Sequence, residues 1–305
     1  MGRVAVVGAT GCVGRQICPA FARRGHEVLA IARHPARHIA SYRFLPLDIA
    51  ALEPEETART LQAERVDVVV NAAGRWGPTE AEMVHSHGGL VERLVAAMDL
   101  LPGRPRVVHL GSVHEYGPVP AGTLIDESIA PNPSNAYART KLAGSTAVLD
   151  ATRAGRMDGV VLRAVNIYGP HPPQETFLAA LLRKLHGATS GGVIEVSIAP
   201  ARRDFVDVRD VAEAVVKAAA APVVGRVVNI GRGEAMEMHE LVTLLFSAAG
   251  LPLDMLKVRD EQVPNRGGGG DWTRADIRLA AELLGWRPEI SPWESVRAMW
   301  DAFTY

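Results

Sequence analysis

The N-terminal segment constrains the fold of this chain more than any other part of the sequence. A short apolar run, Val4–Val7, leads directly into Gly8-Ala9-Thr10-Gly11-Cys12-Val13-Gly14, and an amphipathic stretch follows. Glycines permit a tight turn between a strand and a helix, and they allow backbone N–H groups to approach a phosphate. The first turn of the helix adds a partial positive charge. The segment, with its G-x-x-G-x-x-G spacing, therefore predicts the pyrophosphate loop of a dinucleotide-binding fold.

Short β-branched runs alternate with longer amphipathic stretches over the first half of the chain. The runs expected to form strands are Val4–Val7, Glu27–Ala32, Val66–Val70, Arg106–Leu110 and Gly159–Leu162. The stretches expected to form helices are Val13–Arg24, Pro54–Ala63, Glu80–Met98 and Ala136–Ala154. Continuous apolar strands separated by helices predict a doubly wound α/β fold, in which a parallel sheet is covered on both faces and binds ligands at the carboxyl ends of its strands.

The alternation loosens after residue 165, where the Pro/Gly-rich segment "NIYGPHPPQ" begins. We expect a Rossmann domain for NAD(P) over residues 1–165, with residues 203–231 returning to it. Residues 166–202 and 232–305 are expected to form a smaller, C-terminal substrate-binding lid.

The composition narrows the class of partner. Of the 305 residues 48% are hydrophobic, and 33 basic and 34 acidic residues give a net charge of −1, so we expect no nucleic-acid partner.

No apolar run reaches the ~18 residues of a membrane span, and no signal peptide precedes the first strand, so we expect no membrane contact and a cytoplasmic location. Cys12 and Cys18 are expected to be packing residues. No pair of histidines has the neighbours that a metal site requires, so we expect no metal.

The residues after the second predicted strand indicate which dinucleotide is bound. NAD-binding folds place an acidic residue there for the ribose hydroxyls, and NADP-binding folds place an arginine. This chain has Ala32 at the acidic position and Arg33 next to it, while Arg15 follows the third glycine. Because arginine binds phosphate well, we expect NADP(H) as the cofactor and NAD(H) as the second choice. The alternative is that Arg33 is a solvated loop residue.

Tyr137 and Lys141 are four residues apart near the start of a predicted helix, which puts both side chains on one face. A free tyrosine has a pKa of about 10, and a lysine ammonium held beside it would lower that pKa. The tyrosine could then exchange a proton with an oxygen at the reacting carbon. The pair alone is common by chance, but Ser112 follows the predicted strand Arg106–Leu110, at the edge where ligands bind, and its hydroxyl could orient a substrate carbonyl.

Seven segments of the chain resemble, in the same order, those of the extended short-chain dehydrogenases/reductases, the NAD-dependent epimerase/dehydratase family. They are "GATGCVG", "NAAG", "SVHEYG", "YARTK", "LRAVNIYGP", "RRDFVDVRD" and "LGWRP", and they extend over essentially the whole chain. The resemblance implies a nicotinamide cofactor and usually a nucleotide-sugar substrate. It assigns the acid/base role to Tyr137, the nicotinamide ribose to Lys141 and the third catalytic place to Ser112.

Other positions are expected to lie along the cofactor. Asp48 follows a strand and suits an adenine contact, and "NAAG" at 71–74 would back the dinucleotide, unless it is a simple strand-ending turn. The full set of expected cofactor contacts is Gly8, Thr10, Gly11, Cys12, Val13, Gly14, Arg33, Asp48, Ile49, Ala72, Ala73, Gly74, Tyr137 and Lys141.

The residues after Ser112 bear on the reaction type. Sugar 4,6-dehydratases have Thr-Asp-Glu where this chain has Ser112-Val113-His114, and elimination of water needs both an acid and a base. Val113 can be neither, so dehydration is disfavoured. The stretch "GSVHEYGPVP" is similar to that of 4-ketoreductases of deoxysugar pathways, which implies NADPH-dependent reduction of a dTDP-4-keto-6-deoxyhexose. An NAD-retaining 4-epimerase and a non-catalytic cofactor-sensing protein are the alternatives.

The resemblance also suggests substrate contacts and an assembly. The residues expected to face the nucleotide sugar are Arg75, Val113, His114, Asn166, Arg203 and Arg266. For Arg203 the alternative is a surface ion pair with Asp207 or Asp210. The predicted helices 80–98 and 136–154 commonly form a four-helix dimer interface in related enzymes, so we expect a homodimer.

Overall fold

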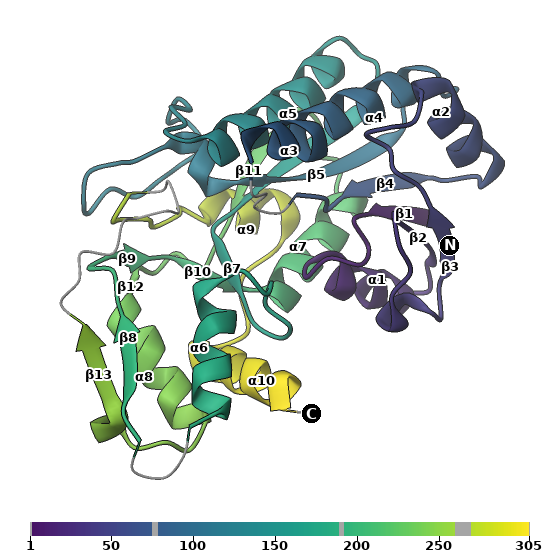
Figure 1. Cartoon of the computed structure of the whole chain (residues 1–305). Helices are drawn as coiled ribbons and strands as arrows, with labels where there is room; N and C mark the ends of the chain where they lie inside the picture. Colours follow the sequence, from purple (N-terminus) through teal and green to yellow (C-terminus); the bar gives the residue numbers. More distant parts are fainter. Residues whose placement is uncertain (1, 75–78, 189–191, 260–269, 305) are drawn as a thin grey trace.

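A seven-stranded parallel sheet forms the centre of the computed structural model, which describes residues 2–74, 79–188, 192–259 and 270–304 (Figure 1). Its strand order is β11-β6-β5-β4-β1-β2-β3, so the chain starts in the middle and winds out in both directions. The strands are β1 (Arg3–Val7), β2 (Glu27–Ala32), β3 (Arg43–Pro46), β4 (Val68–Asn71), β5 (Arg106–Ser112), β6 (Asp158–Ala164) and β11 (Val227–Ile230). The predicted doubly wound α/β fold is confirmed.

Helices cover both faces of the sheet because its strands are apolar on both sides. One face packs against α1 (Gly14–Ala22), α7 (Val208–Ala220) and α9 (Arg278–Leu284), and the other against α2 (Pro54–Ala63), α4 (Leu90–Asp99) and α5 (Ala136–Arg153). Each face has its own hydrophobic core. Ile17 of α1 lies in one core and Leu94 of α4 in the other, and neither is more than 1% exposed. Burying a side chain of this size stabilises the fold by roughly 1.5–3 kcal/mol.

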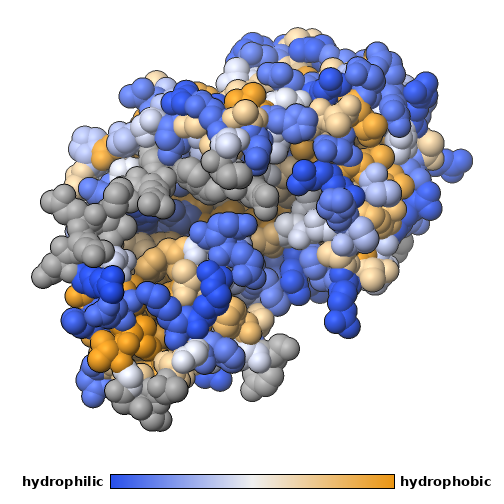
Figure 2. All heavy atoms as spheres, in the orientation of Figure 1, coloured by the Kyte–Doolittle hydropathy of each residue, from blue (hydrophilic) through white to orange (hydrophobic). Residues whose placement is uncertain are grey.

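A third core holds a smaller unit together below one end of the sheet (Figure 1). Its helices are α6 (Phe177–His186), α8 (Met238–Ala248) and α10 (Pro292–Thr304), and its strand pair is β8 (Ile194–Ser197) with β13 (Leu256–Arg259). Leu182, Leu241 and Phe246 are fully buried in this core. Figure 2 shows hydrophobic side chains gathered near β13 and α8, where Val258 and Leu253 are exposed, while most of the surrounding surface is hydrophilic.

Short strands and turns connect the sheet to this smaller unit. β7 (Asn166–Tyr168) pairs with β10 (Phe205–Asp207), and β9 (Arg202–Arg203) pairs with β12 (Met236–Glu237). The single-turn elements are η1 (Arg37–Ile39), η3 (Val113–Tyr116) and η4 (Leu253–Met255).

The long helix predicted over residues 80–98 is interrupted in the structure. α3 (Glu80–Met83) passes into a π-helical turn, η2 (Val84–Gly89), before α4 begins. A π-turn holds one residue more than an α-turn, and such turns are frequent at functional sites. This one buries His87, which is 2% exposed, against α5. Within the described part of the chain, no helix combines the length and the apolar character that a membrane span needs.

Candidate active site

The glycine loop and the turn after β4 are packed so closely that Gly8 and Gly14 leave no room for a side chain. Gly8 has a φ of +79°, and a Cβ there would lie 2.8 Å from the Cα of Ala73. A Cβ on Gly14 would lie 2.2 Å from the carbonyl oxygen of Gly8. Asn71 shapes the facing turn, since its Oδ1 accepts a hydrogen bond from the Ala73 N–H at 3.1 Å. The first turn of α1 therefore begins beside bare backbone, which fits a bound pyrophosphate.

Arg15, just past the third glycine, has two histidine neighbours, whereas Arg33 lies separately, exposed at the end of β2. The positive charge of Arg15 contributes to lowering the pKa of both His38 and His171, after the larger effect of burial, so these three side chains are near neighbours. His171 comes from the loop after β7 and has a φ of 59°. Neither histidine was predicted from the sequence, because each lies in a different loop.

Asp48 and Ile49, two of the predicted cofactor contacts, are held in place by their surroundings. Asp48 Oδ1 accepts a hydrogen bond from the Ala50 N–H at 3.2 Å and shapes its own turn. Ile49 is 2% exposed and packs in the core, so its backbone rather than its side chain can face a ligand.

Ser112, Tyr137 and Lys141 come together at the carboxyl end of β5. Ser112 caps η3, and its side chain shares a hydrogen bond with Tyr137. Lys141 Nζ donates a hydrogen bond to the carbonyl oxygen of Leu110 at 2.5 Å. A Cβ on Gly74, at the end of the turn after β4, would lie 3.2 Å from that nitrogen, so the cofactor-side turn and the reaction site meet here.

The ionisation of the pair differs from the sequence-based expectation. Burial raises the pKa of Tyr137 to about 12, and the hydrogen bond from Ser112 opposes that rise. Burial also lowers the pKa of Lys141 to about 8. The net shift of the Tyr137 pKa is therefore upward, opposite to the lowering expected from Lys141, since burial outweighs the opposing effects and Lys141 directs its ammonium to Leu110.

Two histidine rings flank the tyrosine. The His87 ring is 5.5 Å from that of Tyr137 and edge-on to it, and the His114 ring is 6.1 Å away. His87 Nδ1 is 2.9 Å from Thr140 Oγ1, which in turn donates to the backbone oxygen of Tyr137 at 2.9 Å. The π-turn thus supports the start of α5. The sequence contained no signal for this role of His87, because a regular helix would have placed its ring elsewhere.

Three of the predicted substrate residues, His114, Arg203 and Asn166, lie in the described part of the chain, and their neighbours differ. His114 and Arg203 lie near each other, since the charge of Arg203 adds to burial in lowering the pKa of His114 to about 4. The carboxylate that acts on Arg203 is that of Asp271, whereas Asp207 pairs with Arg209. Asn166 donates its amide to the Asp204 carbonyl oxygen at 2.9 Å.

Three of the predicted substrate residues are either buried or outside the described part of the chain. Val113 is 2% exposed and its side chain packs in the core, so only its backbone could contact a substrate, and that contact stays a prediction. Arg75 and Arg266 lie outside the described residues.

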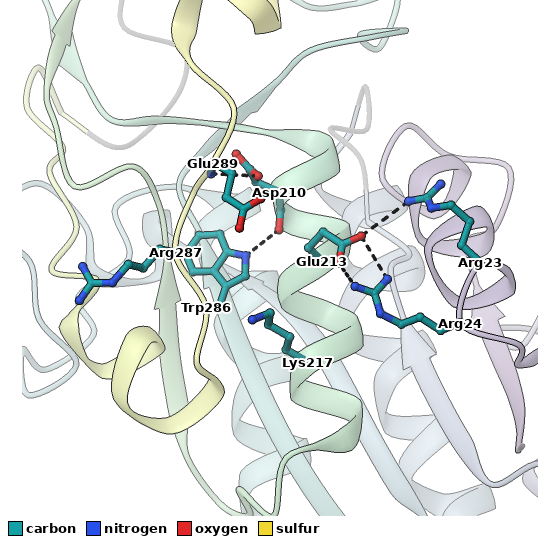
Figure 3. Close-up of a pocket in the computed structure, with 8 residues that line it drawn as sticks. All are labelled: Arg23, Arg24, Asp210, Glu213, Lys217, Trp286, Arg287 and Glu289. Carbon is teal, nitrogen blue, oxygen red and sulfur yellow. Dashed lines mark hydrogen bonds and ion pairs between the residues drawn. The ribbon is translucent and has the colours of Figure 1, made fainter.

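A cavity lined by α1, α7 and residues 286–289 is separate from this site (Figure 3). Two of its carboxylates already have partners: Glu213 pairs with Arg23 and Arg24, and the Asp210 carboxylate accepts the N–H groups of residues 289 and 290. Among the described residues, no three His, Cys, Asp or Glu side chains gather as a metal site would require.

The chain is similar in sequence and in fold to known proteins over nearly its whole length. The model of the NAD-dependent epimerase/dehydratase family matches residues 4–231. A dTDP-6-deoxy-L-talose 4-dehydrogenase (NAD(P)(+)) from Kitasatospora kifunensis is 39% identical over 98% of this chain and 95% of its own. A GDP-6-deoxy-D-mannose reductase from Pseudomonas aeruginosa is 27% identical over 97% of this chain and 95% of its own. The solved structure of MoeE5 with UDP-glucuronic acid and NAD has a TM-score of 0.84 and 25% identity, covering 99% of both chains.

Proposed function

Because this chain belongs to the NAD-dependent epimerase/dehydratase family, we propose that it reduces the C4 keto group of a dTDP-4-keto-6-deoxyhexose with NADPH. The observation that carries the proposal is the meeting of Ser112, Tyr137 and Lys141 at the carboxyl end of β5, beside the turn that ends at Gly74 and packs against the glycine loop. The relatives support the substrate class. The 39% identical protein is named as a 4-dehydrogenase of a dTDP-6-deoxysugar, and a 4-dehydrogenase catalyses the reverse of a 4-ketoreduction.

The residues of the chain handle the proton. A bound NADPH supplies hydride chemistry at a carbonyl carbon. Tyr137 donates its phenolic proton to the carbonyl oxygen, and Ser112 donates a second hydrogen bond to the same atom. With the pKa of Tyr137 raised to about 12, the phenol is protonated at neutral pH, as the acid in a reduction must be. Lys141 and the Gly74 turn would hold the nicotinamide ribose.

His114 supports reduction over elimination. Burial and Arg203 lower its pKa to about 4, so it is a neutral imidazole at neutral pH, and its Nδ1 lacks a hydrogen-bond partner among the described residues. A buried neutral imidazole suits a hydrogen bond to a sugar hydroxyl. Val113, buried in the core, offers no second acid or base for loss of water.

The direct test supplies dTDP-4-keto-6-deoxyglucose with NADPH or NADH and follows the nicotinamide absorbance. We expect stoichiometric oxidation of the reduced cofactor. A separate assay supplies NADP+ with dTDP-6-deoxy-L-talose, a different hexose taken from the name of the 39% identical relative, and should show reduction of the cofactor. An epimerase would instead purify with tightly bound NAD, released on denaturation, and would interconvert C4 epimers without net change in absorbance. That result would replace the reductase proposal.

The cofactor preference has a test of its own at Arg33. In Arg33→Ala, we expect the KM for NADPH to rise about tenfold or more while the KM for NADH changes less than about twofold, because the lost charge would face only the 2′-phosphate. Arg59→Ala removes an exposed arginine from α2 and serves as the control. Equal effects on both cofactors at Arg33 would argue against NADP(H).

We also propose that the chain forms a homodimer through α4 and α5. The two helices lie side by side on one face of the sheet (Figure 1). A shallow pocket on their outer side is lined by Glu92, Arg139, Leu142, Ala143, Thr146 and Ala147. Small residues there allow close approach of a second helix pair, and a two-fold interface would use the same face twice.

A further inference from the structure

A completely buried ion pair lies directly behind the reaction site. Arg163 of β6 donates from Nε to Oε2 of Glu115 at 2.7 Å, and the two side chains are 4% and 0% exposed. Taking two charges out of water costs several kcal/mol per ion unless hydrogen bonds satisfy them. A pair at this depth therefore needs a dense set of partners, and those partners indicate what it does.

The carboxylate of Glu115 binds the two elements that carry the reaction site. Its Oε1 accepts the backbone N–H of Ser112 at 2.8 Å, which completes a capping box around η3. The same oxygen accepts the hydroxyl of Ser145 at 2.9 Å, one helical turn beyond Lys141 on α5. Gly111 makes room for it, because a Cβ there would lie 2.6 Å from Oε1. Glu115 thus joins the end of β5 to α5.

The guanidinium end is anchored away from the site. Arg163 stacks 4.4 Å from the ring centroid of Tyr116, whose hydroxyl donates to Asn229 Oδ1 at 2.9 Å. The Asn229 N–H in turn donates to Glu127 at 2.7 Å. These contacts reach β11 at the edge of the sheet, so the carboxylate is fixed from behind by the main scaffold.

We propose that Glu115 is a positioning residue, whose carboxylate, held by Arg163, fixes Ser112 and α5 in the geometry that brings the Ser112 hydroxyl to Tyr137. The proposal rests on the proposed function of this site, since it concerns the same proton transfer.

The buried charge has a second effect, on ionisation. The groups that face Glu115 are Arg163 from β6 and Tyr137, Lys141 and Ser145 from α5. Its negative charge contributes to raising the pKa of Tyr137, and it opposes the lowering of the pKa of Lys141 by burial. Removing that charge should lower the pKa of both groups.

The test compares the wild type with Glu115→Gln, which keeps an amide oxygen for Ser112 but removes the charge. The readout is the Tyr137 phenolate, measured by ultraviolet difference absorbance at pH 11 without substrate, with Tyr137→Phe versions of each protein as the subtraction. With the wild-type pKa at about 12, about one tenth of Tyr137 is ionised at that pH. We expect about half in Glu115→Gln, a shift of about one pH unit.

Two variants keep the result decisive. Asp210→Asn alters another buried carboxylate that accepts two backbone N–H groups, and it should leave the Tyr137 phenolate unchanged. If Glu115→Gln does not fold, the double variant Glu115→Gln/Arg163→Met removes both charges and should show the same direction of shift. Circular dichroism at pH 11 establishes folding.

A folded variant with the wild-type phenolate fraction, the wild-type kcat and an unchanged alkaline limb of the reduction rate would overturn the proposal; kcat is included because a loosened Ser112 hydrogen bond raises the Tyr137 pKa and so opposes the effect of the lost charge. That limb should move to lower pH, because the acid must be protonated. The absorbance measurement needs no sugar, so it remains valid even if the proposed substrate is not turned over.

Discussion

Replacing Tyr137 by Phe is expected to reduce turnover by about 10²- to 10⁴-fold while cofactor affinity stays within about twofold of the wild type. The change removes one oxygen, the proton donor beside Ser112, and leaves the ring that packs edge-on to His87. The measurements are kcat with the keto sugar and the dissociation constant of NADPH by fluorescence. Losses in both quantities together would indicate a folding defect instead.

Tyr42→Phe is the matched control for this experiment. Tyr42 is also partly buried, but it packs against the core beside η1 and just before β3, the edge strand that β4, β1 and β2 separate from β5 and Ser112. Its hydroxyl has no place in the proposed proton transfer, so kcat should be unchanged. Wild-type turnover in Tyr137→Phe would remove the acid/base assignment altogether.

Replacing Gly14 by Ala is expected to raise the dissociation constant for NADPH at least about 100-fold, or to prevent folding. A Cβ at this position would lie 2.2 Å from the Gly8 carbonyl oxygen, and backbone cannot move aside as a side chain can. The loop would have to open, and its N–H groups would no longer converge on the pyrophosphate. Fluorescence titration measures the affinity, and thermal unfolding separates lost binding from lost structure.

Gly11→Ala provides the comparison within the same loop. Its Cβ would meet only the Gly8 carbonyl oxygen, at 3.3 Å, which a shift of a few tenths of an ångström relieves. We expect a loss of affinity of about tenfold or less. Equal effects at the two positions would mean that the loop is not held against Gly8 as the structure indicates.

The fold could be predicted from the sequence because its signals are local. The glycine loop lies between an apolar strand and a helix, and the run Arg106–Leu110 continues as β5 almost as expected, through Ser112. The π-turn at 84–89 could not be predicted, because the residues on either side of it have ordinary helix propensities. Its extra residue is accommodated by packing against α5.

The reaction site could be predicted only in part. Ser112, Tyr137 and Lys141 carry a family motif, so their meeting was expected. Glu115 and Arg163 lie in two of the segments that resemble the family, but they are 48 residues apart and nothing in either segment indicates that they pair. The direction of the Tyr137 pKa was also missed, because desolvation depends on neighbours that no spacing rule names.

The π-turn makes the reaction site sensitive to a count of residues as well as to their identity. Deleting Gly88 or Gly89 from the π-turn would remove no side chain, and it would let α3 and α4 join as a regular helix. Since each α-helical residue turns the chain by about 100°, His87 would then face away from Thr140, and the support under Tyr137 would be lost. Two chains with identical side chains at Ser112, Tyr137 and Lys141 can therefore differ by one residue in this turn. They would then differ in how firmly Tyr137 is held.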